Sequence, residues 1–174
     1  PVVLSAGEGA YLYLLGDPIK QFTKKSRAPL RLLTRDTPAT LDAVRSGSAH
    51  LGVVVLDGIP DDLEARLLAK VPEVLAVPRG HTLSKLKVIK LAQLSQADLI
   101  VPPVDRPHRI AIERALHALD VHWSVALEAT GWELTLRFVQ MGLGLAIVNG
   151  CCHMPTGVVA IPIPELPATS YYLI

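Results

Sequence analysis

Hydrophobic residues in this chain form short segments of two kinds. Continuous apolar runs such as LGVVVL (Leu51–Leu56) and LAIV (Leu145–Val148) predict strands that are covered on both faces of a sheet. Segments with apolar residues every three or four positions, such as PHRIAIERALHAL (Pro107–Leu119), predict helices with one buried face. Frequent prolines and glycines, 14 and 12 in number, separate these short elements.

The two patterns alternate along the chain, and this alternation predicts the fold class. Strands alternating with helices indicate an α/β fold with largely parallel sheets. We expect a distortion or a tight first turn at Pro18, inside the first helical segment. The expected helices cover 9–25, 38–46, 88–96 and 107–119, and a fifth begins near 130; the expected strands lie within 2–5, 30–35, 51–56, 63–71, 72–78, 98–103, 124–129, 145–148 and, as two short strands, 158–174.

One arrangement occurs twice. In the segments 37–56 and 130–150 a capped helix stops at a glycine and leads into a buried strand. Thr37 is the expected N-cap of the first helix, with Pro38 in its first turn. In the second segment, Thr130 and Glu133 have the spacing of a capping box.

The predicted helix starts indicate a binding site for a small molecule. Four of them follow directly after a predicted strand, in SAGEG, RDT, VDR and TGWE; Asp105 or Arg106 lies near the third cap. In open α/β sheets, ligands bind at the carboxyl ends of the strands. Helix N-termini carry free N–H groups and positive partial charge, so several of them at one edge suit a carboxylate or another anion.

Catalytic and cofactor motifs are not found. The sequence contains no nucleophile elbow, phosphate-binding loop or zinc-protease motif, and we expect neither an enzyme nor a cofactor. The run GLGLAI precedes a strand and reads better as a helix stop than as a dinucleotide fingerprint. His108, near the third helix start, is a candidate pocket residue. The adjacent Cys151 and Cys152 are expected to stay reduced, and CCHM offers too few ligands for a metal site.

Composition narrows the function classes further. The net charge is +1 and 19% of the residues are charged, which disfavours a nucleic-acid-binding surface on this chain. We read the basic segment Lys20–Arg27 as a solvated helix end. No membrane span or signal peptide is expected, and the start on PVVLSAG suggests a domain excised from a longer protein.

In order along nearly the whole chain, four segments resemble the effector-binding domain of LysR-type transcriptional regulators. They are LRLLTRDTPATLDAVRSGSAHLGVVV, LLAKVPEVLAVPRGHTL, LAQLSQADLIVPP and VALEATGWELTLRFVQMGLGLAIV. The resemblance implies two Rossmann-like lobes joined by two crossover strands, as in type 2 periplasmic binding proteins. It assigns 1–78 and 149–174 to lobe I and 79–148 to lobe II, with crossovers near 77–79 and 148–150.

The resemblance also implies a site and partners. A small effector between the lobes, which we expect to be a carboxylate or another anion, would shift the lobes and the oligomer. Arg109 could hold a carboxylate through two hydrogen bonds, although an exposed first-turn arginine is as good a reading. The implied contact residues are Gly9, Ala10, Thr37, Pro38, Val55, Arg106, His108, Arg109, Thr130, Gly131 and Trp132.

The expected assembly is a cytoplasmic homodimer or homotetramer. Tyr11 or Tyr13 could serve at its interface, with core packing as an equal alternative. DNA would be bound only through an N-terminal helix-turn-helix domain that this sequence does not include. Gly9 stands where the family often has serine or threonine, and Asn149 replaces a common proline. The main alternative is a solute-binding protein of a transporter with the same fold, which a secretion signal upstream would favour.

Overall fold

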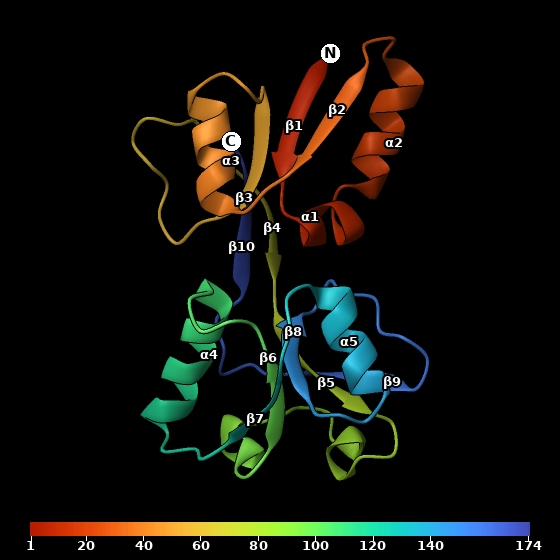
Figure 1. Ribbon diagram of the computed structural model, residues 1–174, viewed down its shortest axis with the longest axis vertical. Helices are drawn as coiled ribbons and strands as arrows, with labels where there is room; N and C mark the ends of the chain where they lie inside the picture. The colour runs from red at the N-terminus through yellow and green to blue at the C-terminus, as the bar shows by residue number, and fades with distance from the viewer. The chain divides into compact units, whose positions relative to one another are not determined.

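The structure is a computed structural model that describes residues 1–174. The chain divides into two compact units, residues 1–71 with 169–174 (unit 1) and residues 72–168 (unit 2). The expected α/β alternation is present in both units (Figure 1). No helix is long and apolar enough to cross a membrane.

Unit 1 is built on one five-stranded sheet in the order β2-β1-β3-β10-β4. Strand β1 pairs in parallel with β2 and β3, whereas β10 runs antiparallel to β3 and β4. The strands are β1 (Val2–Ala6), β2 (Leu30–Thr34), β3 (Leu51–Val55), β4 (Arg66–Val71) and β10 (Thr169–Leu173); the helices are α1 (Glu8–Tyr13), α2 (Gly16–Lys25) and α3 (Thr37–Arg45).

Helix α3 packs closely on the sheet of unit 1 because small residues line the contact. Thr40 and Ala43 are the buried residues of the helix, and the Thr40 hydroxyl lies 2.9 Å from that of Ser5 in β1. Opposite them, Gly52 of β3 leaves room that a side chain would fill: a Cβ there would lie 2.7 Å from Cγ2 of Thr40. The glycine is therefore needed for this close approach of helix and strand.

The single helix expected over 9–25 is two helices, α1 and α2. Helix α2 begins at Gly16 and carries Pro18 in its first turn. Proline has no N–H to donate to the preceding turn, so it is tolerated there but not inside a continuous helix. The phenolic oxygen of Tyr11 in α1 lies 2.9 Å from the carbonyl oxygens of both Leu4 and Leu33, so this side chain joins α1 to β1 and β2.

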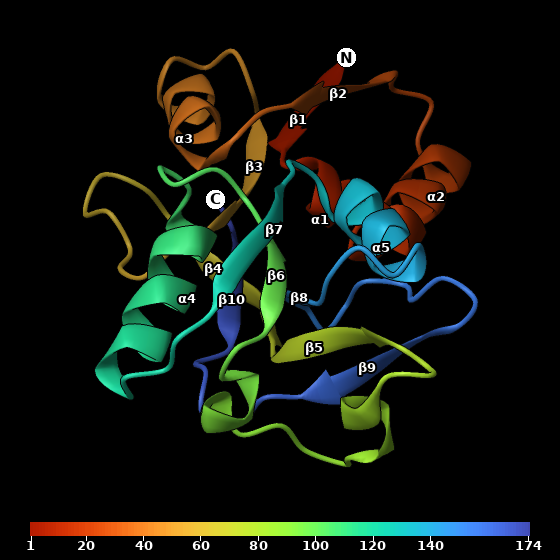
Figure 2. The same ribbon diagram turned by 60° about the horizontal axis from the view of Figure 1, so that its bottom comes forward.

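Unit 2 contains an antiparallel sheet in the order β8-β5-β9 and a parallel pair, β6 with β7. Figure 2 shows β5 beside β9 and β6 beside β7. The two sheets are joined where Leu99 of β6 bridges to Leu145, just before β8. The segment expected as a helix over 88–96 contains only a short 3-10 turn, Leu91–Leu94. The elements are β5 (Glu73–Pro78), β6 (Asp98–Val101), β7 (Ser124–Glu128), β8 (Ala146–Asn149), β9 (Val158–Pro162), α4 (Pro107–Ala118) and α5 (Trp132–Gln140), with a second 3-10 turn at Thr82–Lys85.

The units differ from the expected lobes in their boundaries. The expected lobe I (1–78 and 149–174) would contain β5 and β9. The expected lobe II (79–148) would contain most of β8. In the structure β5 lies between β8 and β9 and pairs with both, so all three belong to unit 2. The chain passes between the units at Val71–Pro72 and at Ala168–Thr169, not near 77–79 and 148–150.

Candidate functional site

In unit 1, two helix starts lie at the same edge of the sheet. Helices α1 and α3 follow β1 and β2, which are parallel neighbours. Strand β3 runs parallel to β1 on its other side and ends at Val55, which is 38% exposed. The carboxyl ends of these three strands therefore bring the α1 start, the α3 start and Val55 to one edge, as the sequence predicts.

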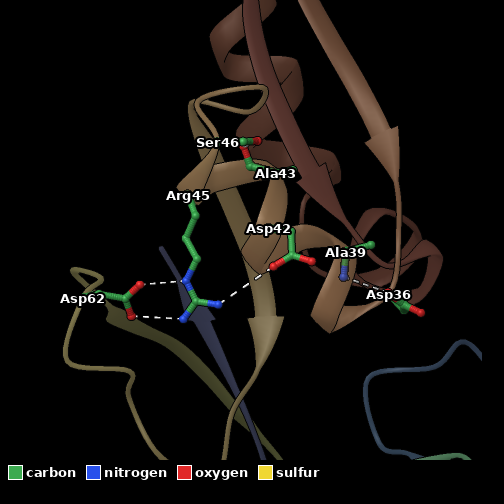
Figure 3. A network of polar contacts seen from close by, with 7 residues as sticks. All are labelled: Asp36, Ala39, Asp42, Ala43, Arg45, Ser46 and Asp62. Carbon is green, nitrogen blue, oxygen red and sulfur yellow. Dashed lines mark hydrogen bonds and ion pairs between the residues drawn. The ribbon is translucent and has the colours of Figure 1, made fainter.

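Asp36, not Thr37, caps helix α3, so the expected N-cap is wrong by one residue. The amide of Ala39 donates a hydrogen bond to Oδ1 of Asp36 at 3.0 Å (Figure 3). Thr37 is the first helical residue and Pro38 follows it in the first turn. An aspartate is as good a cap as a threonine, so the sequence RDT allowed either residue. The Asp36 carboxylate uses one first-turn N–H and adds negative charge at this helix start.

The remaining candidates of unit 1 differ in accessibility. Ala10 is buried inside α1, and Gly9 beside it is half-buried. Thr37 is half-buried and Pro38 is exposed. Helix α1 has only six residues and no side-chain cap. Because Ala10 is buried, it can contribute packing. Gly9 and Thr37 are half-buried and retain accessible surface at this edge of the sheet.

In unit 2 the starts of α4 and α5 lie side by side. The rings of His108 in α4 and Trp132 in α5 meet edge to face, with centroids 4.9 Å apart and planes at 89°. His108 Nε2 lies 2.9 Å from the carbonyl oxygen of Ile147 in β8. If Nε2 donates this bond, Nδ1 is left as an acceptor. The structure thus brings together His108 and Trp132, which are 24 positions apart in the sequence.

Neither of these two helix starts has a side-chain cap. The N-cap of α4 is Arg106, whose side chain makes no capping bond, and Pro107 follows it. The N-cap of α5 is Gly131, with a φ of 96° that disfavours other residues. The capping box expected from Thr130 and Glu133 is therefore not formed, because Gly131 occupies the cap position and Thr130 precedes it. First-turn N–H groups of both helices remain without side-chain acceptors.

Arg109 is committed to contacts inside unit 2. Its side chain is 6% exposed, and Nε donates to Oε1 of Glu113 at 2.6 Å. Nη1 donates to the carbonyl oxygen of Pro102 at 3.1 Å, and the guanidinium lies 5.3 Å from the ring centroid of Trp123. These contacts connect α4 to the end of β6. They also occupy the Arg109 guanidinium, which was expected to hold the carboxylate of a ligand. Arg106 is the exposed arginine at this helix start.

Sequence reasoning missed three participants at these sites. Glu113 follows Arg109 by four residues, a spacing that signals a helical ion pair. Asp36 precedes Thr37 and could have been read as the cap. The Ile147 carbonyl has no local signal, because strand β8 meets α4 only through the tertiary fold. No group of three or more His, Cys, Asp or Glu residues is placed to hold a metal ion.

The fold defines the class of protein. Over 99% of this chain it matches the reduced regulatory domain of OxyR from Pseudomonas aeruginosa, with 18% identity, a TM-score of 0.81 and 85% of that chain covered. It also matches the CcmR regulatory domain of Synechocystis PCC6803 in complex with 2-PG, with 16% identity, a TM-score of 0.80, and 99% and 86% of the two chains covered. This is the mixed α/β fold of type 2 periplasmic binding proteins.

The sequence places the chain in one family of that class. Residues 1–174 match the family described as LysR substrate binding domain, and the chain belongs to this family. A curated relative, the HTH-type transcriptional regulator SsuR of Burkholderia cenocepacia, is 25% identical over 160 residues, covering 88% of this chain and 52% of the relative. The chain thus spans about half the length of that regulator. The resemblance found in the sequence is confirmed, and the family is not an enzyme class.

Proposed function

We propose that this domain binds a small anionic metabolite and is the sensing part of a cytoplasmic LysR-type transcriptional regulator. One observation carries the proposal: the starts of α4 and α5 lie side by side without side-chain caps. Two adjacent sets of first-turn N–H groups, with their positive partial charge, suit a carboxylate or a similar anion. The family match favours a regulator over a solute-binding protein of a transporter.

Arg106 and the aromatic pair would complete this binding surface. Arg106 is exposed at the α4 start and supplies a full positive charge. His108 and Trp132 supply an apolar wall with a polar ring nitrogen. Thr130 offers a hydroxyl next to Gly131. A ligand with one anionic group and an apolar body fits this set of groups. BenM, a neighbour of 18% identity and TM-score 0.80, was solved with its effector benzoate.

The residues of unit 1 extend the proposal to an effector bound between two lobes. Thr37, Pro38, Gly9 and Val55 gather at the carboxyl edge of the unit 1 sheet. An effector that contacts residues of both units would favour one arrangement of the units by its difference in affinity. In the intact regulator that preference would pass through a homodimer or homotetramer to helix-turn-helix domains that contact DNA.

A thermal-shift screen of small carboxylates, sulfonates and phosphates tests this function. A ligand that binds only the folded domain raises its melting temperature in a concentration-dependent way. With the strongest hit, Arg106→Gln should weaken binding about tenfold or more, since a hydrogen bond to a charged group contributes about 1.5–3 kcal/mol. Arg114→Gln, an exposed arginine further along α4, is the matched control and should leave the Kd unchanged.

A second pair of variants tests the contribution of unit 1. Thr37→Val removes the hydroxyl at the α3 start, and Thr34→Val is its control on the exposed end of β2. A several-fold loss of affinity with the first variant alone supports an effector that contacts both units. A hit that binds equally well to Arg106→Gln and Thr37→Val would refute this assignment of the site.

A further inference from the structure

Two contacts fix the ring of His108 in unit 2. Its Nε2 atom lies 2.9 Å from the carbonyl oxygen of Ile147, and the ring meets that of Trp132 edge to face. A carbonyl oxygen only accepts hydrogen bonds, so Nε2 carries the proton. In the neutral ring Nδ1 is then an acceptor, and no group of the protein donates a hydrogen bond to it. Strand β8 therefore sets the tautomer of His108 and leaves Nδ1 available to a ligand.

The free nitrogen points away from the interior of the unit. The two nitrogens of an imidazole ring point in nearly opposite directions. Because Nε2 points at β8, all of whose residues are buried, Nδ1 is directed away from that strand. The side chain of His108 is half-buried and retains accessible surface.

The backbone at this helix start offers donors close to that acceptor. His108 follows Pro107, which has no N–H. The amide of Ile110 donates the first bond of the helix, to the carbonyl oxygen of Arg106 at 3.0 Å, so the amides of His108 and Arg109 remain free. The amide nitrogen and Nδ1 of one histidine are separated by only a few covalent bonds. His108 thus presents a donor and an acceptor to the same small region.

This pairing of donor and acceptor selects the group next to the anion of a ligand. The free amides and the exposed Arg106 donate hydrogen bonds and suit a carboxylate. Nδ1 accepts only, so it would repel a carboxylate oxygen and needs a donor from the ligand. A hydroxyl on the carbon that bears the carboxylate supplies this donor. An ammonium group there would meet the positive charge of Arg106 and of the helix start, which favours a hydroxy acid over an amino acid.

We propose that His108 is the specificity-determining residue of the effector site in unit 2 and that the effector is an α-hydroxy carboxylate with an apolar body. The inference rests on the proposed function, because it assigns a ligand class to that same site. The ligand hydroxyl donates to Nδ1, while the carboxylate accepts from the first-turn amides and Arg106. A ligand that lacks the hydroxyl buries Nδ1 without a partner and binds more weakly for that reason.

Matched pairs of acids that differ by one hydroxyl test this inference. Lactate and propionate, leucate and isocaproate, and mandelate and phenylacetate carry apolar bodies of increasing size. Dissociation constants are measured by calorimetry at mildly alkaline pH, where histidine side chains are neutral. In at least one pair the hydroxy acid should bind about threefold or more tightly than its deoxy partner, the effect of one neutral hydrogen bond.

The outcomes separate this inference from the proposed function. A smaller preference in every pair, or a preference for the deoxy acid, refutes the assigned ligand class but leaves the anion site in place. The same holds if the thermal-shift screen yields only sulfonates or phosphates and none of these carboxylates binds. If no anion of any class binds at millimolar concentration, the proposed function fails together with the inference.

Three variants assign the preference to His108. His108→Phe keeps an aromatic ring beside Trp132 but removes both nitrogens, so the preference should disappear while the deoxy acid still binds. His108→Asn can place an amide oxygen near the position of Nδ1 and should keep part of the preference. His117→Phe, at an exposed histidine further along α4, is the matched control and should leave it unchanged. A full preference in His108→Phe would contradict the role of His108, and melting curves check that each variant folds.

Discussion

The two units bury their hydrophobic residues in different ways. Unit 2 has a continuous core of large side chains, with Leu75, Ile89 and Leu94 at 0% exposure. Unit 1 relies on small residues under α3, with a cluster of Val3, Ala43 and Ala49. In unit 1 the helix and the sheet pack through close approach of their backbones. In unit 2 large side chains fill the core and stabilise the fold. The same α/β layering can therefore be stabilised by two kinds of packing, which respond to different substitutions.

The exposed residues show the same contrast. The edge strands of the unit 1 sheet leave Leu32, Leu67 and Leu68 at least 44% exposed, and α2 has no buried residue. In unit 2 every residue of β8 is buried, as are the first five of β5. Unit 1 thus derives less of its stability from burial of large apolar side chains, and its close contacts matter correspondingly more.

Leu75→Ala should have the largest effect, because it opens a cavity at the centre of unit 2. We expect a loss of about 2–5 kcal/mol in the free energy of unfolding, measured by urea denaturation. Leu32→Ala, on the exposed face of β2, is the matched control and should change stability by less than about 0.5 kcal/mol. A similar loss for the two variants would contradict the contrast between the units.

Gly52→Ala should have the next largest effect, because it tests close packing in unit 1. The added methyl group would overlap Thr40 and approach Cγ1 of Ile174 to 2.9 Å. Overpacking of this kind costs about 1–3 kcal/mol. Gly58→Ala is the control, since a Cβ there meets nothing within 4 Å and its φ is not positive. If the melting temperatures of both variants equal that of the wild type, α3 does not depend on the glycine.

The sequence pattern predicted local features of both units well. Gly47 and Gly142 end their helices with positive φ values, 72° and 78°, as the helix-stop reading requires. Continuous apolar runs identified β3 and β8 as strands; β8 is buried throughout, and β3 is buried at its three central residues. These successes share a cause: the hydrophobic period and the glycine stops depend on residues a few positions apart. The two predicted side-chain caps were wrong, because Asp36 caps α3 and Gly131 occupies the cap position of α5.

Features that depend on residues far apart in the sequence could not be predicted from the sequence pattern. The run that became β5 does not specify that its partners are β8 and β9, so the boundaries of the units differ from the expected lobes. Arg109 was read as a free cation because Trp123 and the Pro102 carbonyl reach it only in the folded chain. The expected site residues do gather at the strand ends of each unit, and their contact with an effector stays a prediction.

Asp62→Asn should have the smallest effect, because it removes an ion pair on the surface of unit 1. Arg45, the last residue of α3, donates to the two carboxylate oxygens of Asp62 at 2.7 and 3.0 Å (Figure 3). Both side chains are substantially exposed, at 40% and 57%, so solvent and salt screen the pair and the loss of stability should be small.

The pH dependence of this effect has a definite sign. The hydrogen bonds from Arg45 lower the pKa of Asp62, so the folded state favours the ionised carboxylate. The contribution to stability is therefore present above the pKa of the unfolded chain and disappears as the pH falls through the lowered value. Melting temperatures of the wild type and Asp62→Asn should differ slightly at neutral pH and converge in acid. Asp61→Asn, a neighbouring exposed carboxylate in the same loop, is the control. A difference that grows in acid would show that the pair does not stabilise unit 1 in this way.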